Sequence, residues 1–99
     1  MLLKNGPRLR TIVEQLLVTA SVHRAQKEFP RIEEFFDGIK WALARNPIRG
    51  AVKVKEGETV LGYVIRTTAW KAGRVPSVTV TYQVTENEII IEGIAIREE

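Results

Sequence analysis

Residues 78–99 read VTVTYQVTENEIIIEGIAIREE and carry the clearest strand pattern in the sequence. Apolar and polar residues alternate at its start, which predicts a strand at 77–84 with one buried and one wetter face. A polar connection follows, in which Asn87 tolerates a positive φ. The apolar run after it predicts a second strand at 88–96, and Gly93 within that run indicates a bulge. These residues are therefore expected to form an antiparallel hairpin.

Further extended segments precede this hairpin. Period-two alternation predicts a strand at 59–67, and residues 51–55 fit a short strand or an extended loop. Residues 68–76 are expected to form a longer loop. That loop carries one aromatic residue and two cations: Trp70, Lys71 and Arg74.

The first half of the chain carries helical patterns. Apolar residues at three- and four-residue steps predict a helix that begins at Pro30 and ends at Asn46, which precedes a second proline. Ser21 is expected to cap a shorter helix at 22–28 through its hydroxyl. Residues 11–19 match helical spacing, but their β-branched content fits a buried strand equally well.

The order of these elements predicts an α+β domain in which two N-terminal helices pack on an antiparallel sheet of about four strands. With 99 residues there is room for one core. We therefore expect a loose N-terminal arm at 1–10 and a single domain at 11–99. No apolar run reaches the ~18 residues of a membrane helix, and we expect a cytoplasmic protein without a membrane partner.

Composition excludes several chemistries. The sequence has no cysteine and one histidine, His23, so disulfides, a Cys nucleophile and a structural zinc site are excluded. No metal or other cofactor is expected. His23 lies away from the basic residues and is expected on the surface, whereas Trp41 and Tyr82 are expected in the core.

Charge is distributed unevenly along the chain. The net charge is +3, but residues 40–74 hold eight Lys or Arg against two Glu, a local charge of +6. Residues 75–99 hold one Arg against five Glu. The positive charge of residues 40–74 fits binding of a polyanion or an acidic partner. It also fits an ordinary solvated surface.

Three segments carry a resemblance to a known family. They are LLVTASVHRAQKEF (Leu16–Phe29), RIEEFFDGIKWALARNP (Arg31–Pro47) and the terminal hairpin quoted above. In this order they resemble the RelE/ParE toxin superfamily of bacterial type II toxin–antitoxin systems. The resemblance implies that family's fold, and it favours a strand for residues 11–19.

The resemblance also implies a function and a site. RelE-type members cut messenger RNA on the ribosome, with Lys and Arg on the exposed sheet face stabilising the phosphate as a ribose 2′-hydroxyl attacks it. Arg66 and Arg97 match positions of such basic residues and are the candidate catalytic residues. Candidate residues for binding RNA or a partner are Lys53, Lys55, Trp70, Lys71 and Arg74. The sequence departs from the pattern at Thr79, where RelE members carry an Arg, and it stops at Glu99, before a segment that often supplies a further Tyr or cation.

Two functions from this family stay open, and a third lies outside it. The first is a RelE-like endoribonuclease, with ribosome and messenger RNA as targets. The second is a non-catalytic member of the family, either a ParE-like inhibitor of a protein target such as DNA gyrase or a degenerate toxin kept as a binding module. Either implies a cognate antitoxin as partner. The third is a general nucleic-acid-binding domain, which would bind DNA or RNA without cleavage and with steep salt dependence.

Overall fold

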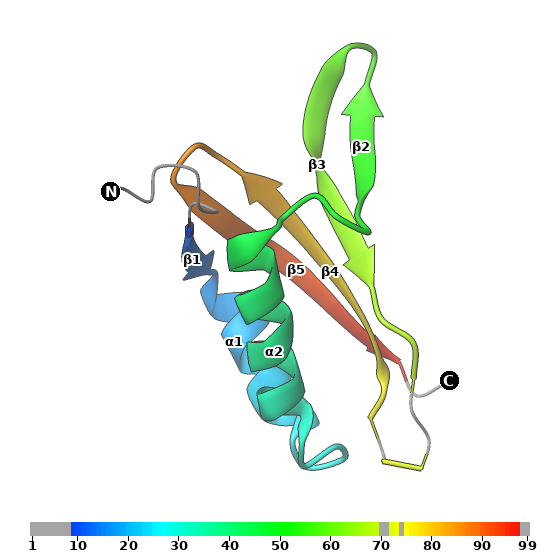
Figure 1. Ribbon diagram of the computed structural model, residues 1–99. Coiled ribbons are helices and arrows are strands. Elements are labelled where there is room, and N and C mark those ends of the chain that lie inside the picture. Colours follow the sequence, from blue (N-terminus) through cyan, green and yellow to red (C-terminus); the bar gives the residue numbers. More distant parts are fainter. Residues whose placement is uncertain (1–8, 70–71, 74, 98–99) are drawn as a thin grey trace.

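The computed structural model describes residues 9–69, 72–73 and 75–97, which form two layers. The elements follow in the order β1 (Thr11–Glu14), α1 (Leu16–Ala25), α2 (Ile32–Arg45), β2 (Val52–Glu56), β3 (Thr59–Arg66), β4 (Ser77–Val84) and β5 (Glu88–Arg97). Both helices lie against one face of a single sheet (Figure 1). The predicted α+β class and the two N-terminal helices are confirmed. Residues 1–8 of the predicted arm lie outside the described residues.

The sheet is larger than predicted and is not wholly antiparallel. It has five strands in the order β1-β5-β4-β3-β2. The β2, β3, β4 and β5 strands pair antiparallel, but β1 pairs parallel with β5. The expectation of about four antiparallel strands is wrong because β1, only four residues long, takes the free edge of β5.

The first helix also differs from the prediction. Only Thr11–Glu14 is strand, and α1 begins at Leu16, so neither a strand over 11–19 nor a helix over 22–28 is correct. Ser21 lies inside the helix, where its Oγ donates a hydrogen bond to the Leu17 carbonyl at 2.9 Å instead of capping. The helix forms because its buried valines, one turn apart, pack on the sheet, and this packing outweighs weak β-branched propensity.

The core lies between the helices and the central strands. Helix α2 contributes a stripe at three- and four-residue steps, as its pattern predicts. Alternate residues of β4 and β5 face this stripe. The fully buried hydrophobic set comprises Val18, Ile32, Phe36, Leu43, Val78, Val80, Tyr82, Ile89 and Ile91.

The two aromatic residues expected in the core have different outcomes. Tyr82 is buried as predicted, stacks on Tyr63 with ring centroids 5.9 Å apart, and donates its hydroxyl to the Pro47 carbonyl. Burial raises the pKa of Tyr82 to about 12, with a smaller contribution from Tyr63. Trp41 is 61 % exposed, so its predicted core position is wrong. It lies two residues from both Ile39 and Leu43, which turns it to the opposite side of the helix.

The register of β4 and β5 shifts between Thr81 and Tyr82, which leaves Glu92 of β5 as the extra residue. Gly93 follows directly, so the predicted bulge is confirmed. A Cβ at Gly93 would lie 2.6 Å from Thr81 Oγ1, which explains the glycine.

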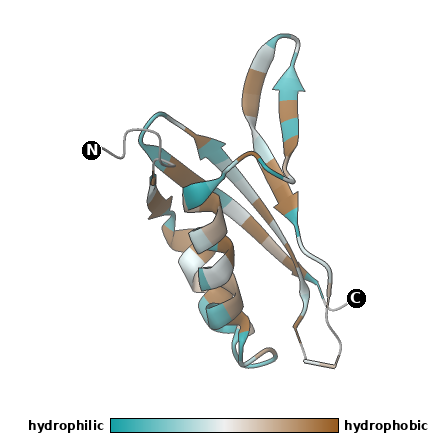
Figure 2. Ribbon diagram, in the orientation of Figure 1, coloured by the Kyte–Doolittle hydropathy of each residue, from teal (hydrophilic) through white to brown (hydrophobic). Residues whose placement is uncertain are grey.

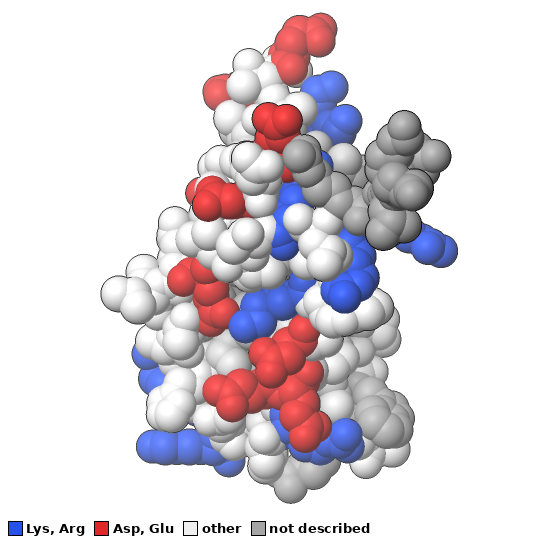
Figure 3. All heavy atoms as spheres, turned by 60° about the vertical axis from the view of Figure 1, so that its left-hand side comes forward, with Lys and Arg blue, Asp and Glu red and all other residues white. Residues whose placement is uncertain are grey.

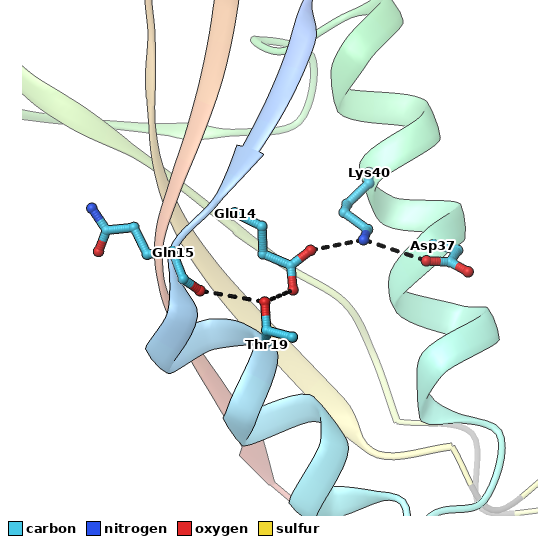
Figure 4. A network of polar contacts seen from close by, with 5 residues as sticks. All are labelled: Glu14, Gln15, Thr19, Asp37 and Lys40. Carbon is cyan, nitrogen blue, oxygen red and sulfur yellow. Dashed lines mark hydrogen bonds and ion pairs between the residues drawn. The ribbon is translucent and has the colours of Figure 1, made fainter.

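A polar network joins β1 to both helices (Figure 4). Lys40 Nζ of α2 lies 2.8 Å from Glu14 Oε1 and 3.4 Å from Asp37 Oδ1. Thr19 of α1 donates its hydroxyl to Glu14 Oε2 at 2.6 Å. Burial opposes ionisation of Glu14, but the Lys40 and Thr19 hydrogen bonds outweigh it and the pKa of Glu14 lies below its usual value. Burial likewise opposes the charge of Lys40, and its hydrogen bond to Glu14 raises the Lys40 pKa nonetheless.

Neither α1 nor α2 is long and apolar enough to cross a membrane, and these are the helices of the described part of the chain.

Candidate functional site

The candidate site lies on the sheet face that the helices leave uncovered, which we call the open face (Figure 1). Side chains alternate between the two faces along β4. Val78, Val80 and Tyr82 are buried under the helices, whereas Thr81 and Gln83 on the other face are exposed. The sequence predicts this division of β4 correctly.

Both candidate catalytic arginines lie on the open face. Arg66 of β3 pairs with Thr79 of β4, and Arg97 of β5 pairs with Ser77. Directly paired residues share a face, and Ser77 and Thr79 are two residues apart on one strand, so all four side chains leave the same side. The two arginines flank β4, with Cα atoms roughly 12 Å apart from the strand spacing and rise. Side chains of this length can contact neighbouring phosphates of a single strand.

A short chain of hydrogen bonds holds Arg66 against the end of β4. Arg66 Nε donates to Ser77 Oγ at 3.4 Å, and Ser77 Oγ donates to the Thr67 carbonyl at 2.9 Å. Thr67 also extends the ladder past the end of β3, since its N–H donates to the Val78 carbonyl at 2.9 Å. Ser77 is the buried polar residue here, at 3 % exposure. Arg66 is therefore oriented by a hydroxyl that is itself fixed.

An open cavity of about 300 Å³ lies beside this arginine. Its lining mixes apolar surface with one cation and consists of Arg66, Thr67, Thr68, Ala69 and Ser77. The Arg66 guanidinium beside this hollow suits an anionic oxygen group, whereas the Thr67 hydroxyl is already hydrogen-bonded to the Val78 backbone. The sequence analysis missed Ser77 and the threonines, because their place beside Arg66 depends on the register of β3 and β4.

The candidate binding lysines do not join this group. Lys53 of β2 pairs with Tyr63, whose ring stacks on the buried Tyr82, so Lys53 belongs to the helix-side face of the sheet. Lys55 is two residues further along the same strand and leaves the same face. Both are exposed on a hairpin that extends beyond the helices (Figure 1). Trp70, Lys71 and Arg74 lie outside the described residues.

The basic middle of the chain does not form one basic surface on the side of the molecule seen in Figure 3. Lys and Arg side chains there lie next to Asp and Glu side chains. The charge count along the chain therefore overstates the field over this side of the molecule.

The described part of the site offers charge stabilisation and no evident pair for proton transfer. His23 is exposed on α1, in the other layer. Tyr82 belongs to the buried side of β4, and its raised pKa keeps the phenol protonated. Glu92, at the β5 bulge, accepts a hydrogen bond from Gln83 Nε2 at 3.0 Å. Within the same described residues, no three His, Cys, Asp or Glu side chains gather as metal ligands would.

Comparison with known proteins found no matching family model, no matching curated sequence and no matching solved structure. The function is therefore argued from the chain's own geometry and from the resemblance described above.

Proposed function

We propose that the open face binds the phosphate backbone of RNA, and that the protein is a RelE/ParE-type toxin that cleaves messenger RNA. The observation that carries this proposal is the register, which puts Arg66 and Arg97 on one uncovered face on either side of β4. Fixed cations stabilise the charge that develops on phosphate oxygens when a 2′-hydroxyl attacks. The cavity beside Arg66 gives one phosphate a defined position.

In this proposal Arg66 and Arg97 have separate tasks. Arg66 is oriented by Ser77 and lines the cavity, so it holds the phosphate that reacts. Arg97 is exposed at the end of β5 and holds the adjacent backbone. Removing a positioned cation of this kind costs on the order of 10²–10³ in rate. Removing the second cation weakens binding and lowers its salt dependence by about 0.7 in the log–log slope.

The proposed partner is a cognate antitoxin with an extended acidic segment. Strand β2 lies at the edge of the sheet, and all five of its residues are exposed. Its valines and lysines alternate along the strand (Figure 2), so one side is apolar and the other cationic. A strand that alternates apolar and acidic residues would complement both sides while pairing with the free edge.

The test is expression in a bacterium without any partner, with growth and the 5′ ends of messenger RNA followed together. We expect growth arrest and new RNA ends. The variant R66A/R97A abolishes both effects. The matched control K53A/K55A removes two cations from the other face of the sheet. It should still cause growth arrest and new RNA ends. New RNA ends that persist in R66A/R97A, or arrest and cleavage lost in the control alone, would refute the assignment of the site.

A second candidate is a non-catalytic, ParE-like inhibitor of DNA gyrase. The observation that favours it is Thr79, which lies directly across from Arg66 where RelE members carry a cation. In that case growth arrest occurs without new RNA ends and survives the double arginine variant. Purified protein then inhibits supercoiling by gyrase in vitro, which the RNA-cleaving toxin does not.

A further inference from the structure

Helix α2 presents four conspicuous residues on the side opposite the core. Glu34, Gly38, Trp41 and Arg45 follow one another at steps of four, three and four, which places them within about 60° of each other around the helix. The buried stripe of α2, which includes Phe36 and Leu43, points the other way. We call these four residues the outer stripe. Within the described fold, Glu34 pairs with Arg31 at 3.4 Å and Arg45 lies on Trp41, but the exposure of Trp41 and the glycine at Gly38 serve no contact there.

Trp41 is the large apolar member of the stripe. It is 61 % exposed, and the Arg45 guanidinium lies 3.7 Å from the centre of its ring. Arg45 Nη1 also donates to the Trp41 carbonyl at 3.1 Å. The pair is thus held in one arrangement in the absence of any partner. Tryptophan and arginine are the residue types that most often dominate binding at protein interfaces.

Gly38 is the second unexplained member. It lies in the middle of a 14-residue helix, where glycine is less favourable than alanine. A Cβ at this position would meet nothing within 4 Å. Packing inside the chain therefore does not require a glycine here. The position provides room for close approach by another surface.

The outer stripe is complementary to itself. Its four residues are symmetric about the point midway between Ile39 and Lys40. When a second copy of α2 is laid antiparallel across this point, Trp41 of each copy covers Gly38 of the other. The same operation sets Arg45 of each copy against Glu34 of the other, and Glu34 is 74 % exposed and pairs at 3.4 Å with the similarly exposed Arg31. Antiparallel helices also bring opposite ends of their dipoles together.

We propose that the protein forms a two-fold symmetric homodimer through the outer stripe of α2. The partner is a second copy rather than an unrelated protein because each outer stripe carries both members of each contact. Trp41 of one copy fits over Gly38 of the other, and Arg45 of one copy meets Glu34 of the other. This contact lies on the opposite layer from the open face. The proposal is independent of the proposed function.

The first test is sedimentation of the purified full chain over a range of concentrations. One helix per subunit makes a small interface, so we expect reversible dimerisation with a dissociation constant of about 10–100 µM. The variant W41A weakens the dimer roughly 30-fold. The variant G38Q blocks the close approach, while helical content and melting temperature stay at or above those of the parent. A monomer at all concentrations overturns the proposal, as does a dimer that both variants leave intact.

A charge-swap experiment tests the antiparallel arrangement itself. In R45E each contact sets Glu against Glu, and in E34R each sets Arg against Arg, so either variant alone is monomeric. An equimolar mixture restores both contacts and forms a heterodimer. The control R24E makes the same charge change in the last turn of α1 and leaves dimerisation unchanged. Two monomeric variants that fail to associate when mixed, or a control that is itself monomeric, refute the arrangement.

Discussion

Replacing Lys40 by methionine removes the charge that joins α2 to β1. The Lys40 ammonium lies 2.8 Å from Glu14, and the two side chains are 25 % and 18 % exposed. Methionine keeps most of the hydrocarbon chain over the Phe36 ring, where the ammonium lies 4.8 Å from the centroid. What is lost is the partner of a mostly buried carboxylate. Glu14 then keeps only Thr19 among its hydrogen-bond donors in this network.

Breaking the Lys40–Glu14 pair should destabilise the fold by more than the loss of an exposed ion pair and by less than the loss of a fully buried one. We expect K40M to lower the free energy of unfolding by about 2 kcal/mol at pH 7. For a domain of this size the melting temperature falls by roughly 10 °C. Circular dichroism on heating measures this directly. The control K27M removes an exposed lysine and should leave the melting temperature within about 2 °C.

The pH dependence separates charge from packing. The pKa of Glu14 is lowered, so its stabilisation is present above the ordinary value of 4.5 and is lost as the pH falls through the lowered pKa. The pKa of Lys40 is raised, so its contribution is present below 10.5 and is lost as the pH rises through the raised pKa. The difference between wild type and K40M should therefore be full at pH 7 and shrink at pH 3. An equal difference at both pH values would mean that the loss does not come from the Lys40–Glu14 ion pair, which refutes the reasoning.

Three further substitutions test the fold around the site. Y82F leaves the buried Pro47 carbonyl without its phenol donor, and we expect a loss of about 2 kcal/mol in urea denaturation. G93A puts a Cβ 2.6 Å from Thr81 Oγ1, so it should lower the melting temperature and alter the backbone amide shifts of β4 and β5. G57A puts alanine at a left-handed position with φ of 62° and should lower the free energy of unfolding by about 1 kcal/mol in the same urea titration.

Much of the fold could be predicted because the strongest patterns are local. The β4–β5 hairpin and α2 each combine one clear period with a buried face, and both formed as expected. The structure of the first helix and the first strand could not be predicted from local patterns. Strand β1 has four residues and takes its partner from the other end of the chain. Helix α1 begins after Gln15, whose side chain makes no capping hydrogen bond, so no start signal marks it.

The arrangement of the candidate site could be predicted from the sequence only in part. Alternation assigns each residue to a face, but only the register says which residues of different strands meet. Arg66 and Ser77 lie close together because β3 and β4 pair with Arg66 opposite Thr79. A charge count along the chain grouped Lys53 with these residues, although β2 turns its lysines to the opposite face. Charge along the sequence therefore only identifies candidate cations, and strand pairing decides which of them share a face of the sheet.

The two proposed surfaces lie on opposite sides of a two-layer molecule, and this arrangement links them. A dimer through α2 would bury helical surface and leave both open faces pointing outward, each with its own Arg66 and Arg97. Neither proposal needs the other, since G38Q removes the dimer without touching β3 or β5. If both hold, one dimer carries two separate RNA sites, and an antitoxin strand paired with the edge of β2 lies at the far edge of the sheet from β1. Loss of the dimer in G38Q should then leave the toxicity per subunit unchanged, and a parallel loss of both would show that the two surfaces are coupled.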